Sequence, residues 1–256
     1  MPTTSISYIE TPLLAFVLGR ADDALVLGHR LSQWCGHAPM LEEDIALANI
    51  ALDHIGQARA IYGYAASFAG LGEDDLAFLR DAAQYRNCLL VEQSNGDFAA
   101  TIVRQFLYTA FVDLWWRAMT RSADATLAAI AAKSEKESAY HLRHSAEWLI
   151  RLGDGTADSH ARAQKALEAQ WMYTGELFET DPATSALIAT RVAANPETLR
   201  ANWNATIDTV LAEATLRRPA EAWMQSGGRA GRHTEQLGLM LAEMQHLPRS
   251  FPGAIW

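Results

Sequence analysis

The most constraining feature of this sequence is a set of four long segments with helical periodicity. Apolar side chains recur in them every three or four residues, proline is rare inside them, and no bounded run of alternating β-branched residues predicts a strand. The predicted helices span residues 11–34, 41–69, 97–121 and 123–152. At about 1.5 Å per residue, such helices reach roughly 35 to 45 Å and can pack along their full length. We therefore predict an all-α protein.

The connections between these segments indicate how the helices are arranged. Gly36 and Pro39 stop the first helix, because glycine suits a helix end and proline cannot continue one. Residues 73–95 are predicted to hold a short helix and an irregular crossover, after which Asp97 is a good N-cap for the third helix. Two helical hairpins joined by one longer connection are typical of a ferritin-like four-helix bundle. We predict such a bundle over about residues 11–152.

The remaining part of the chain, about residues 156–256, is predicted to form a helical C-terminal extension. Asn195 and Pro196 mark the start of one helix there, since they are an N-cap residue followed by proline at the first helical position. No Ser- or Gly-rich linker separates the extension from the bundle, so residues 1–256 are predicted to be a single domain. The helices predicted in the extension span residues 159–178, 195–214 and 234–247.

Charge and composition argue against several functional classes of protein. The formal net charge is −9 and no cluster of Lys and Arg occurs, which argues against a nucleic-acid-binding surface. The longest apolar run, residues 12–19, is far shorter than the roughly 20 residues that a membrane-spanning helix needs. The first ten residues lack the basic start of a signal peptide, and Cys35 and Cys88 provide no disulfide framework. We therefore predict a cytoplasmic protein without a membrane anchor.

A candidate metal-binding cluster lies on the fourth predicted helix. Glu137, His141 and His144 are spaced by four and three residues, so their side chains can lie near one face of that helix. Ferritin-like di-iron bundles carry Glu-x-x-His on two helices and one further Glu on each of the other two. Here Tyr140 stands three residues after Glu137, where that motif requires His.

The other predicted bundle helices supply no Glu-x-x-His motif. Glu243 and His246 form the one such pair of the chain, and a single match of so short a pattern carries little weight. The adjacent Asp53 and His54 diverge by about 100° on a helix, which predicts a surface feature rather than a pair of ligands. The polar candidates on the first three bundle helices are Asp22, Asp23, His29, Asp44, Asp53, His54, Gln105 and Asp113.

Two interpretations of the cluster around Glu137 remain. It is either a partial iron site or a buried polar cluster whose members hydrogen-bond to one another and to neighbours such as Tyr140 or Arg143. The missing histidine and the absence of the motif elsewhere in the bundle favour the polar cluster.

The glycine- and arginine-rich segment 227–235 is the other irregular stretch of interest. Its glycines and arginines could cradle a phosphate at a helix start, but the Lys-Ser/Thr ending and the preceding strand of a P-loop are both missing. We therefore predict a loop that docks against the bundle or against a partner protein.

Several dispersed blocks, in the same order along the chain, resemble the PaaC family of phenylacetic acid degradation proteins. The resemblance extends from about Leu18 to Trp256, and because it rests on many separate blocks it is more specific than any single motif. The blocks are Trp34–Pro39, Ala46–Ile50, Gly56–Arg59, Leu89–Gln93, Tyr140–Arg143, His233–Glu235 and Met240–Met244.

The resemblance implies a defined role. Members of that family share the ferritin-like fold of a di-iron catalytic subunit, have lost its ligand set, and pair with that subunit in phenylacetyl-CoA 1,2-epoxidase. The resemblance implies an O2-dependent, NADPH-driven oxygenase complex with a small accessory subunit and a reductase that carries FAD and an iron–sulfur cluster. It implies no catalytic residue, metal or cofactor in this chain, and it makes Glu137, Tyr140, His141 and His144 the remnants of a degenerate di-iron site.

Two alternatives to a structural subunit remain at this point. The chain could be a di-iron or di-manganese oxidase with an atypical ligand set that uses Glu137, His141 and His144. It could also be a helical acyl-CoA-binding protein that uses the following side chains of the glycine-rich segment: Arg229, Arg232 and His233.

Overall fold

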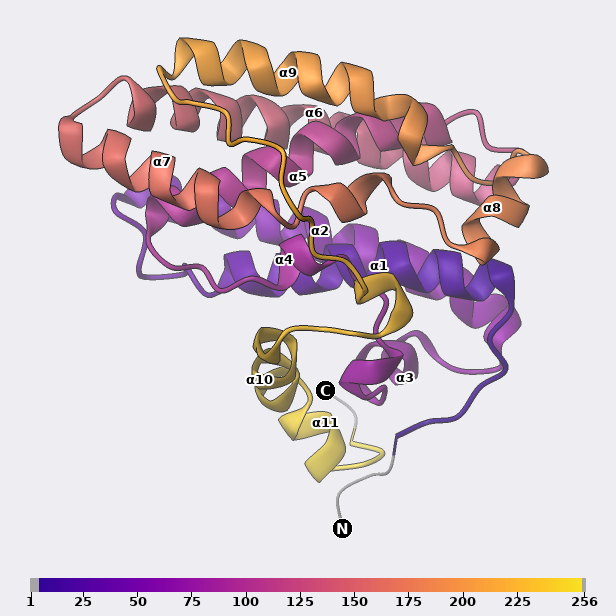
Figure 1. Ribbon diagram of the computed structural model, residues 1–256. Coiled ribbons are helices and arrows are strands. Elements are labelled where there is room, and N and C mark those ends of the chain that lie inside the picture. Colours follow the sequence, from indigo (N-terminus) through magenta and orange to yellow (C-terminus); the bar gives the residue numbers. More distant parts are fainter. Residues whose placement is uncertain (1–4, 255–256) are drawn as a thin grey trace.

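The computed structural model describes residues 5–254, and this part of the chain is helical and contains no strand. The ends, residues 1–4 and 255–256, which the single-domain prediction also includes, lie outside the described residues. Four long helices form a bundle: α1 (Pro12–Ser32), α2 (Leu41–Ala69), α5 (Phe98–Met119) and α6 (Ala125–Gly153) (Figure 1). Helix α1 packs against α2, α5 against α6, and α2 against α6. The all-α, ferritin-like fold predicted from the sequence is confirmed.

Local sequence signals set the ends of the bundle helices. The Thr11 side chain caps α1 by accepting a hydrogen bond from the amide of Leu14, and Asp97 caps α5 as predicted by accepting from the amide of Ala100. Helix α2 ends at Gly70, whose φ of 70° lies in the left-handed region that favours glycine.

The crossover between the two hairpins is irregular but well packed. It contains α3 (Glu73–Phe78), a 3₁₀ turn η1 (Ala82–Gln84) and the short helix α4 (Leu89–Glu92), so the predicted short helix and irregular connection are confirmed. Arg80, Tyr85 and Cys88 of this segment are fully buried.

The C-terminal extension is broken into shorter helices than the sequence predicted. The helix predicted over 159–178 ends at Trp171 and is followed by a separate 3₁₀ helix that begins at Gly175, where a Cβ atom would come within 2.8 Å of the Met224 Cβ atom. Helix α8 was not predicted, although Asp181 caps it and Pro182 occupies its first position. The elements are α7 (Ala157–Trp171), η2 (Gly175–Phe178), α8 (Pro182–Ala189), η3 (Pro196–Leu199), α9 (Arg200–Glu213), η4 (Gly228–Ala230), α10 (Glu235–Met244) and α11 (His246–Ser250).

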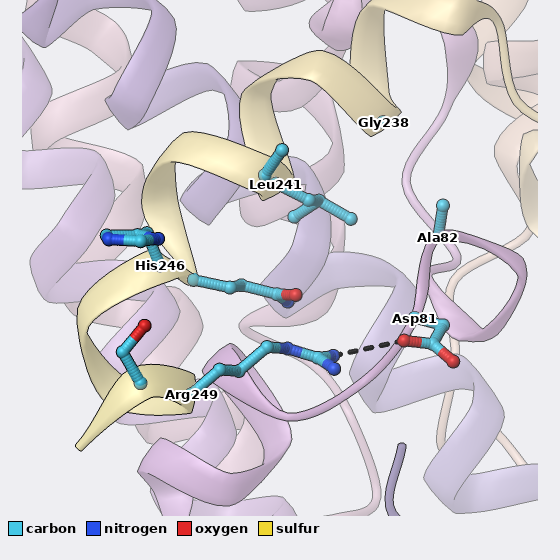
Figure 2. Close-up of a pocket in the computed structure, with 9 residues that line it drawn as sticks. Asp81, Ala82, Gly238, Leu241, His246 and Arg249 are labelled. Atoms are coloured by element: carbon cyan, nitrogen blue, oxygen red, sulfur yellow. Dashed lines mark hydrogen bonds and ion pairs between the residues drawn. The ribbon is translucent and has the colours of Figure 1, made fainter. Parts of the chain in front are cut away.

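The extension covers only part of the bundle. Helices α7 and α9 pack on α5 and α6, and α8 packs on α1, whereas none of the extension helices packs along α2 within residues 5–254 (Figure 1). Helices α10 and α11 lie beside the crossover and line, together with Asp81 and Ala82, an open pocket of about 680 Å³ (Figure 2). The ion pair between Arg249 and Asp81, with atoms 3.1 Å apart, borders this pocket.

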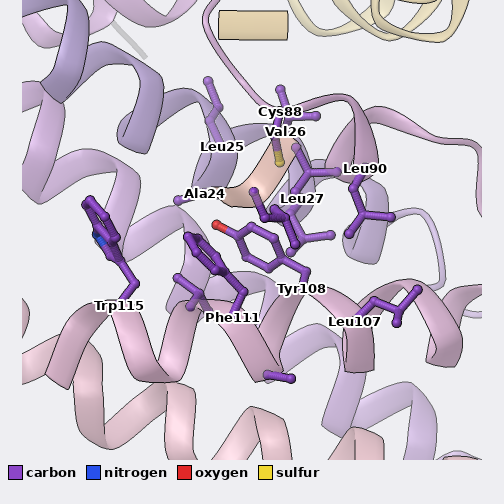
Figure 3. Close-up of a cluster of buried hydrophobic side chains, with 14 of the residues drawn as sticks. Ala24, Leu25, Val26, Leu27, Cys88, Leu90, Leu107, Tyr108, Phe111 and Trp115 are labelled. Atoms are coloured by element: carbon purple, nitrogen blue, oxygen red, sulfur yellow. The ribbon is translucent and has the colours of Figure 1, made fainter. Parts of the chain in front are cut away.

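The apolar core runs from the bundle into the extension. Figure 3 shows its centre, where apolar side chains of α1 and the crossover meet Tyr108, Phe111 and Trp115 of α5. The Phe111 ring contacts Phe178 at 5.4 Å between ring centroids, and Phe178 in turn contacts Trp203 of α9 at 5.3 Å. Burial of these aromatic side chains therefore couples α9 and η2 to the bundle.

Candidate functional site

Three side chains of α6 contact three side chains of α2 where the two helices pack, a region that we call the α2–α6 seam. The contacts join His141 Nε2 to Asp53 Oδ2 at 2.9 Å, His144 Nε2 to Glu43 Oε2 at 2.9 Å, and Gln57 Nε2 to Glu137 Oε2 at 2.8 Å. The three candidate residues therefore do lie near one face of α6, as their spacing predicted. Their partners are residues of α2, not one another or Arg143, which corrects the predicted pairing.

Tyr140 does not point into the bundle. Its side chain is 43% exposed and stacks on the ring of His144, with ring centroids 6.3 Å apart. At 100° per residue, a step of three turns the side-chain direction back by 60°, while a step of four advances it by 40°. Glu137 lies on the flank that faces α2, so Tyr140 is rotated outward and His141 inward. Tyr140 therefore borders the cluster by ring contacts and lies at its outer edge.

His54 is buried in the bundle, which corrects its prediction as a surface residue. It is 1% exposed, and its ring lies against that of His141 with centroids 5.0 Å apart. The two side chains of Asp53 and His54 do diverge, but Leu47, Ile50 and His54 lie on the same inward face of α2. Asp53 and His54 therefore reach the His141 ring from different sides.

The centre of the bundle around His54 disfavours positive charge. Burial lowers the pKa of His54 well below its ordinary value, and the neighbouring His141 lowers it further. Both ring nitrogens of His54 and Nδ1 of His141 are buried and have no hydrogen-bond partner within the described chain, and the same holds for Ser138 Oγ of α6 and Gln105 Oε1 of α5. A neutral imidazole is therefore the stable form of His54.

These residues do not fit a di-iron centre. Such a centre in a ferritin-like bundle is held by four Glu and two His that converge on two ions. Across residues 5–254, no group of three His, Cys, Asp or Glu side chains is placed to hold a metal ion. Each carboxylate of the α2–α6 seam is instead engaged with a single side chain of the facing helix.

The carboxylates of α1, which were candidate ligands, bind other parts of the chain. Asp22 forms a fully buried ion pair with Arg80 of the crossover and accepts a hydrogen bond from the amide of Arg86 at 2.7 Å. Asp23 pairs with Arg229, with Nη2 and Oδ2 2.6 Å apart. Both carboxylates therefore anchor distant segments to α1.

The glycine-rich segment docks on the bundle, which confirms one of its two predicted roles. The Glu176 carboxylate accepts hydrogen bonds from the amides of Gly227 at 2.9 Å and Gly228 at 2.7 Å. Gly228 is required because a Cβ atom there would lie 2.2 Å from the carbonyl oxygen of Asn87. We call the buried ion pairs of Asp22, Asp23 and Glu92, together with the contacts of Glu176, the anchoring network.

His233 completes this docking contact. Its Nδ1 donates to the Glu92 carboxylate at 2.7 Å, and the same carboxylate accepts from the amide of Thr234 at 2.6 Å. Burial opposes a charge on His233, but the hydrogen bond and the charge of Glu92 outweigh it and raise the pKa of His233 above its ordinary value. Arg229 and His233 are thus bound to carboxylates of their own chain.

The other candidate residues form no shared site, although the charge of Glu243 acts on His29. Asp113 pairs with Arg117 at 2.9 Å, Asp44 accepts from the amide of Gly36 at 2.7 Å, and burial lowers the pKa of His29. Glu243 and His246 are both exposed, on α10 and α11. Reasoning from periodicity and motifs missed four residues whose roles depend on partners distant in the chain: Glu43, Gln57, Glu92 and Glu176.

Comparison with known proteins defines the wider relationship. The model of the family described as "Phenylacetic acid catabolic protein" matches residues 2–256. A subunit of the 1,2-phenylacetyl-CoA epoxidase of Escherichia coli (strain K12) is 51% identical over 249 residues, which cover 95% of this chain and 99% of that protein. Among the described residues, no helix has the length and apolar character needed to cross a membrane.

Proposed function

The chain belongs to the phenylacetic acid catabolic protein family, and we propose that it is the counterpart of the Escherichia coli protein in a 1,2-phenylacetyl-CoA epoxidase. The observation that carries this proposal is the 51% identity to that epoxidase subunit over nearly the full length of both chains. The ferritin-like bundle agrees with it.

Within that complex, the proposed role is structural. The chain supports the helices of a catalytic di-iron subunit and carries out no chemical step itself. The pairwise contacts of the α2–α6 seam support this role, because they engage the carboxylates and imidazoles that a ligand set would need. A displacement of about 1 Å at a reacting centre can cost about 100-fold in rate, so a supporting subunit is able to govern catalysis.

The remaining components follow from the same proposal. The catalytic subunit holds the iron, and a reductase with FAD and an iron–sulfur cluster delivers electrons from NADPH for the reaction of O2 with phenylacetyl-CoA. The assembly also includes a small accessory subunit, and it works in the cytoplasm. The residues of this chain that correspond to a degenerate metal site are Glu137, Tyr140, His141 and His144.

Co-expression of the chain with the catalytic subunit tests this proposal. We expect the two proteins to co-purify as one species in native mass measurement, with the iron in the catalytic subunit. The chain expressed alone should contain no stoichiometric iron. Stoichiometric iron in the isolated chain, with the absorption of an oxo-bridged pair, would contradict the structural role and favour the oxidase alternative.

A further inference from the structure

An open, mainly apolar groove of about 580 Å³ lies between α3 and α11, at the lower end of the molecule in Figure 1. We call it the α3–α11 groove, and its lining includes Asp74, Asp75, Phe78, Leu79, Leu247 and Phe251. We propose that the side chains of Ile255 and Trp256, the two residues that follow Ala254, occupy this groove and fasten α11 to α3. This inference goes beyond the proposed function and does not depend on it.

The α11 wall of the groove is apolar and uncovered. Leu247 and Phe251 are 52% and 56% exposed, and their spacing of four residues places them on one side of the chain. They line the groove together with the partly buried Phe78. Large apolar side chains that stand together in water favour burial by a further apolar group. Within residues 5–254, no side chain provides that cover.

Polar contacts hold α11 beside the end of α3 and so set the position of this wall. Arg249 Nε donates to the carbonyl oxygen of Phe78 at 3.3 Å, and Gln245 Nε2 donates to the carbonyl oxygen of Arg80 at 2.9 Å. Arg249 also pairs with Asp81, as Figure 2 shows. A groove whose walls are fixed before it is filled loses less conformational entropy when a side chain binds there.

The course of the chain after α11 favours its own residues as the occupant. The amide of Ala254 donates to the carbonyl oxygen of Phe251 at 3.2 Å, and Gly253 has a φ of 79°, in the left-handed region. This turn makes Pro252, Gly253 and Ala254 part of the groove lining. Ile255 therefore begins at the groove. A side chain tethered this closely has a high effective concentration and pays little loop-closure entropy, unlike a separate molecule.

The chemistry of the groove matches an indole side chain. Indole is a large apolar ring with one N–H donor, and that donor usually finds an acceptor when the ring is buried. The α3 wall supplies carboxylates one helical turn before Phe78 and Leu79: Asp74 and Asp75. Asp75 Oδ2 already accepts from the amide of Gly72 at 2.9 Å, whereas Asp74 is exposed and accepts no hydrogen bond among the described residues. Asp74 is thus an acceptor available to the Trp256 indole.

The deciding experiment measures how fast the indole N–H groups of the ¹⁵N-labelled full-length chain exchange hydrogen with water, by nuclear magnetic resonance. The signal of Trp256 is identified by its loss in Trp256→Phe. It should exchange about tenfold or more slowly than that of Trp223, since burial of one large apolar side chain supplies at least that factor. Trp223 is the internal reference because it is 71% exposed. Equal exchange rates of the two indoles would overturn the inference.

A second measurement tests whether Trp256 touches the α11 wall. Trp256→Ala should speed backbone amide exchange in α11 about tenfold or more, measured by mass spectrometry, whereas the matched control Trp223→Ala should leave it unchanged. Leu247→Ala removes part of the wall, and residues in contact do not act independently. The double variant Trp256→Ala with Leu247→Ala should therefore change the exchange rate by less than the product of the two single effects. A combined effect equal to that product would contradict the contact. Thermal unfolding followed by circular dichroism should show each variant folded.

Other occupants of the groove give different results. Sedimentation that shows a homodimer, with Leu247→Glu dissociating it, would assign the groove to a second copy. Protection of the Trp256 indole that arises after the catalytic subunit is added would assign the groove to that protein. Either result overturns the inference and leaves the proposed function intact. Protection of the indole in the monomeric chain, lost in Leu247→Glu, supports the inference.

Discussion

The α2–α6 seam and the anchoring network are both polar regions of a helical bundle, yet they are built differently. In the seam Asp53 and Glu43 each contact one histidine, and Glu137 contacts Gln57 and Lys133; the side chains of Asp53, Glu137 and Glu43 remain 40%, 18% and 9% exposed. In the anchoring network Asp22 and Arg80 are completely buried, and Asp22 has further donors in Tyr62 and the amide of Arg86.

The anchoring network and the α2–α6 seam therefore use charged side chains for different purposes. A buried carboxylate without its cation is strongly destabilising, so the network fixes the crossover and the glycine-rich segment to α1. The seam joins two helices weakly and leaves their outer face free. Four sets of variants test this contrast, beginning with the largest expected effect.

Removing Asp22 should cost the most stability. Asp22→Ala leaves the Arg80 guanidinium buried without its carboxylate, which typically costs about 3–5 kcal/mol. The free energy of unfolding from urea titrations measures the loss. Arg162→Ala, which removes exposed ion pairs with Asp158 and Asp97, should cause little measurable change. Equal effects of the two variants would remove the distinction between network and surface pairs.

A larger side chain in the docked 227–234 segment should cause the next largest loss of stability. Gly228→Ala places a Cβ atom 2.2 Å from the Asn87 carbonyl oxygen, and overpacking of this kind costs about 1–3 kcal/mol. Gly238→Ala on α10 is the matched control, because a Cβ atom there meets nothing within 4 Å. Limited proteolysis should then cut the 227–234 segment faster in the first variant only.

The anchoring network and His54, whose ring lies beside His141 of the seam, should change stability with pH in opposite directions. The pKa of His233 is raised in the folded state, so its contribution is present below its unfolded pKa and is lost as the pH rises through the folded pKa. The pKa of His54 is lowered, so the unfolded state binds the proton more readily and stability falls as the pH drops below about 6.5.

Urea unfolding of two variants between pH 5 and 8 separates these contributions. His54→Leu should flatten the loss of stability on the acidic side, and His233→Gln should flatten the loss on the alkaline side. The same pH profile in both variants and the wild type would show that neither histidine governs it.

The smallest effect is expected in the seam. Glu137→Gln keeps the shape of the side chain and its contact with Gln57, so the free energy of unfolding should change by less than about 1 kcal/mol. If the chain is structural, Glu137→Ala and His141→Ala should also leave the iron content of the co-purified complex unchanged. A proportional loss of iron in those variants would instead support an oxidase site in this chain.

Much of the fold was predictable because helix formation is largely local. The long helices, the Asp97 cap and the bundle layout followed from periodicity, caps and the length of the crossover. Helix α8 was missed although its cap and proline were visible, since it is short. Three serines, Ser134, Ser138 and Ser145, are buried on α6 and were not singled out, because polar residues do not mark a core in an apolar pattern.

The sequence by itself thus determined the long helices, the side of α6 shared by Glu137 and His141, and the absence of Glu-x-x-His from the bundle helices. Only the tertiary structure decided the partners: Arg229 and Asp23 lie 206 positions apart, and His233 and Glu92 lie 141 apart. Periodicity shows only in which direction each side chain points around the axis of its own helix. Ion pairs between distant residues depend on how separate elements pack, which periodicity does not show. For that reason Tyr140, which the motif placed in a metal site, is found on the outer surface of the bundle.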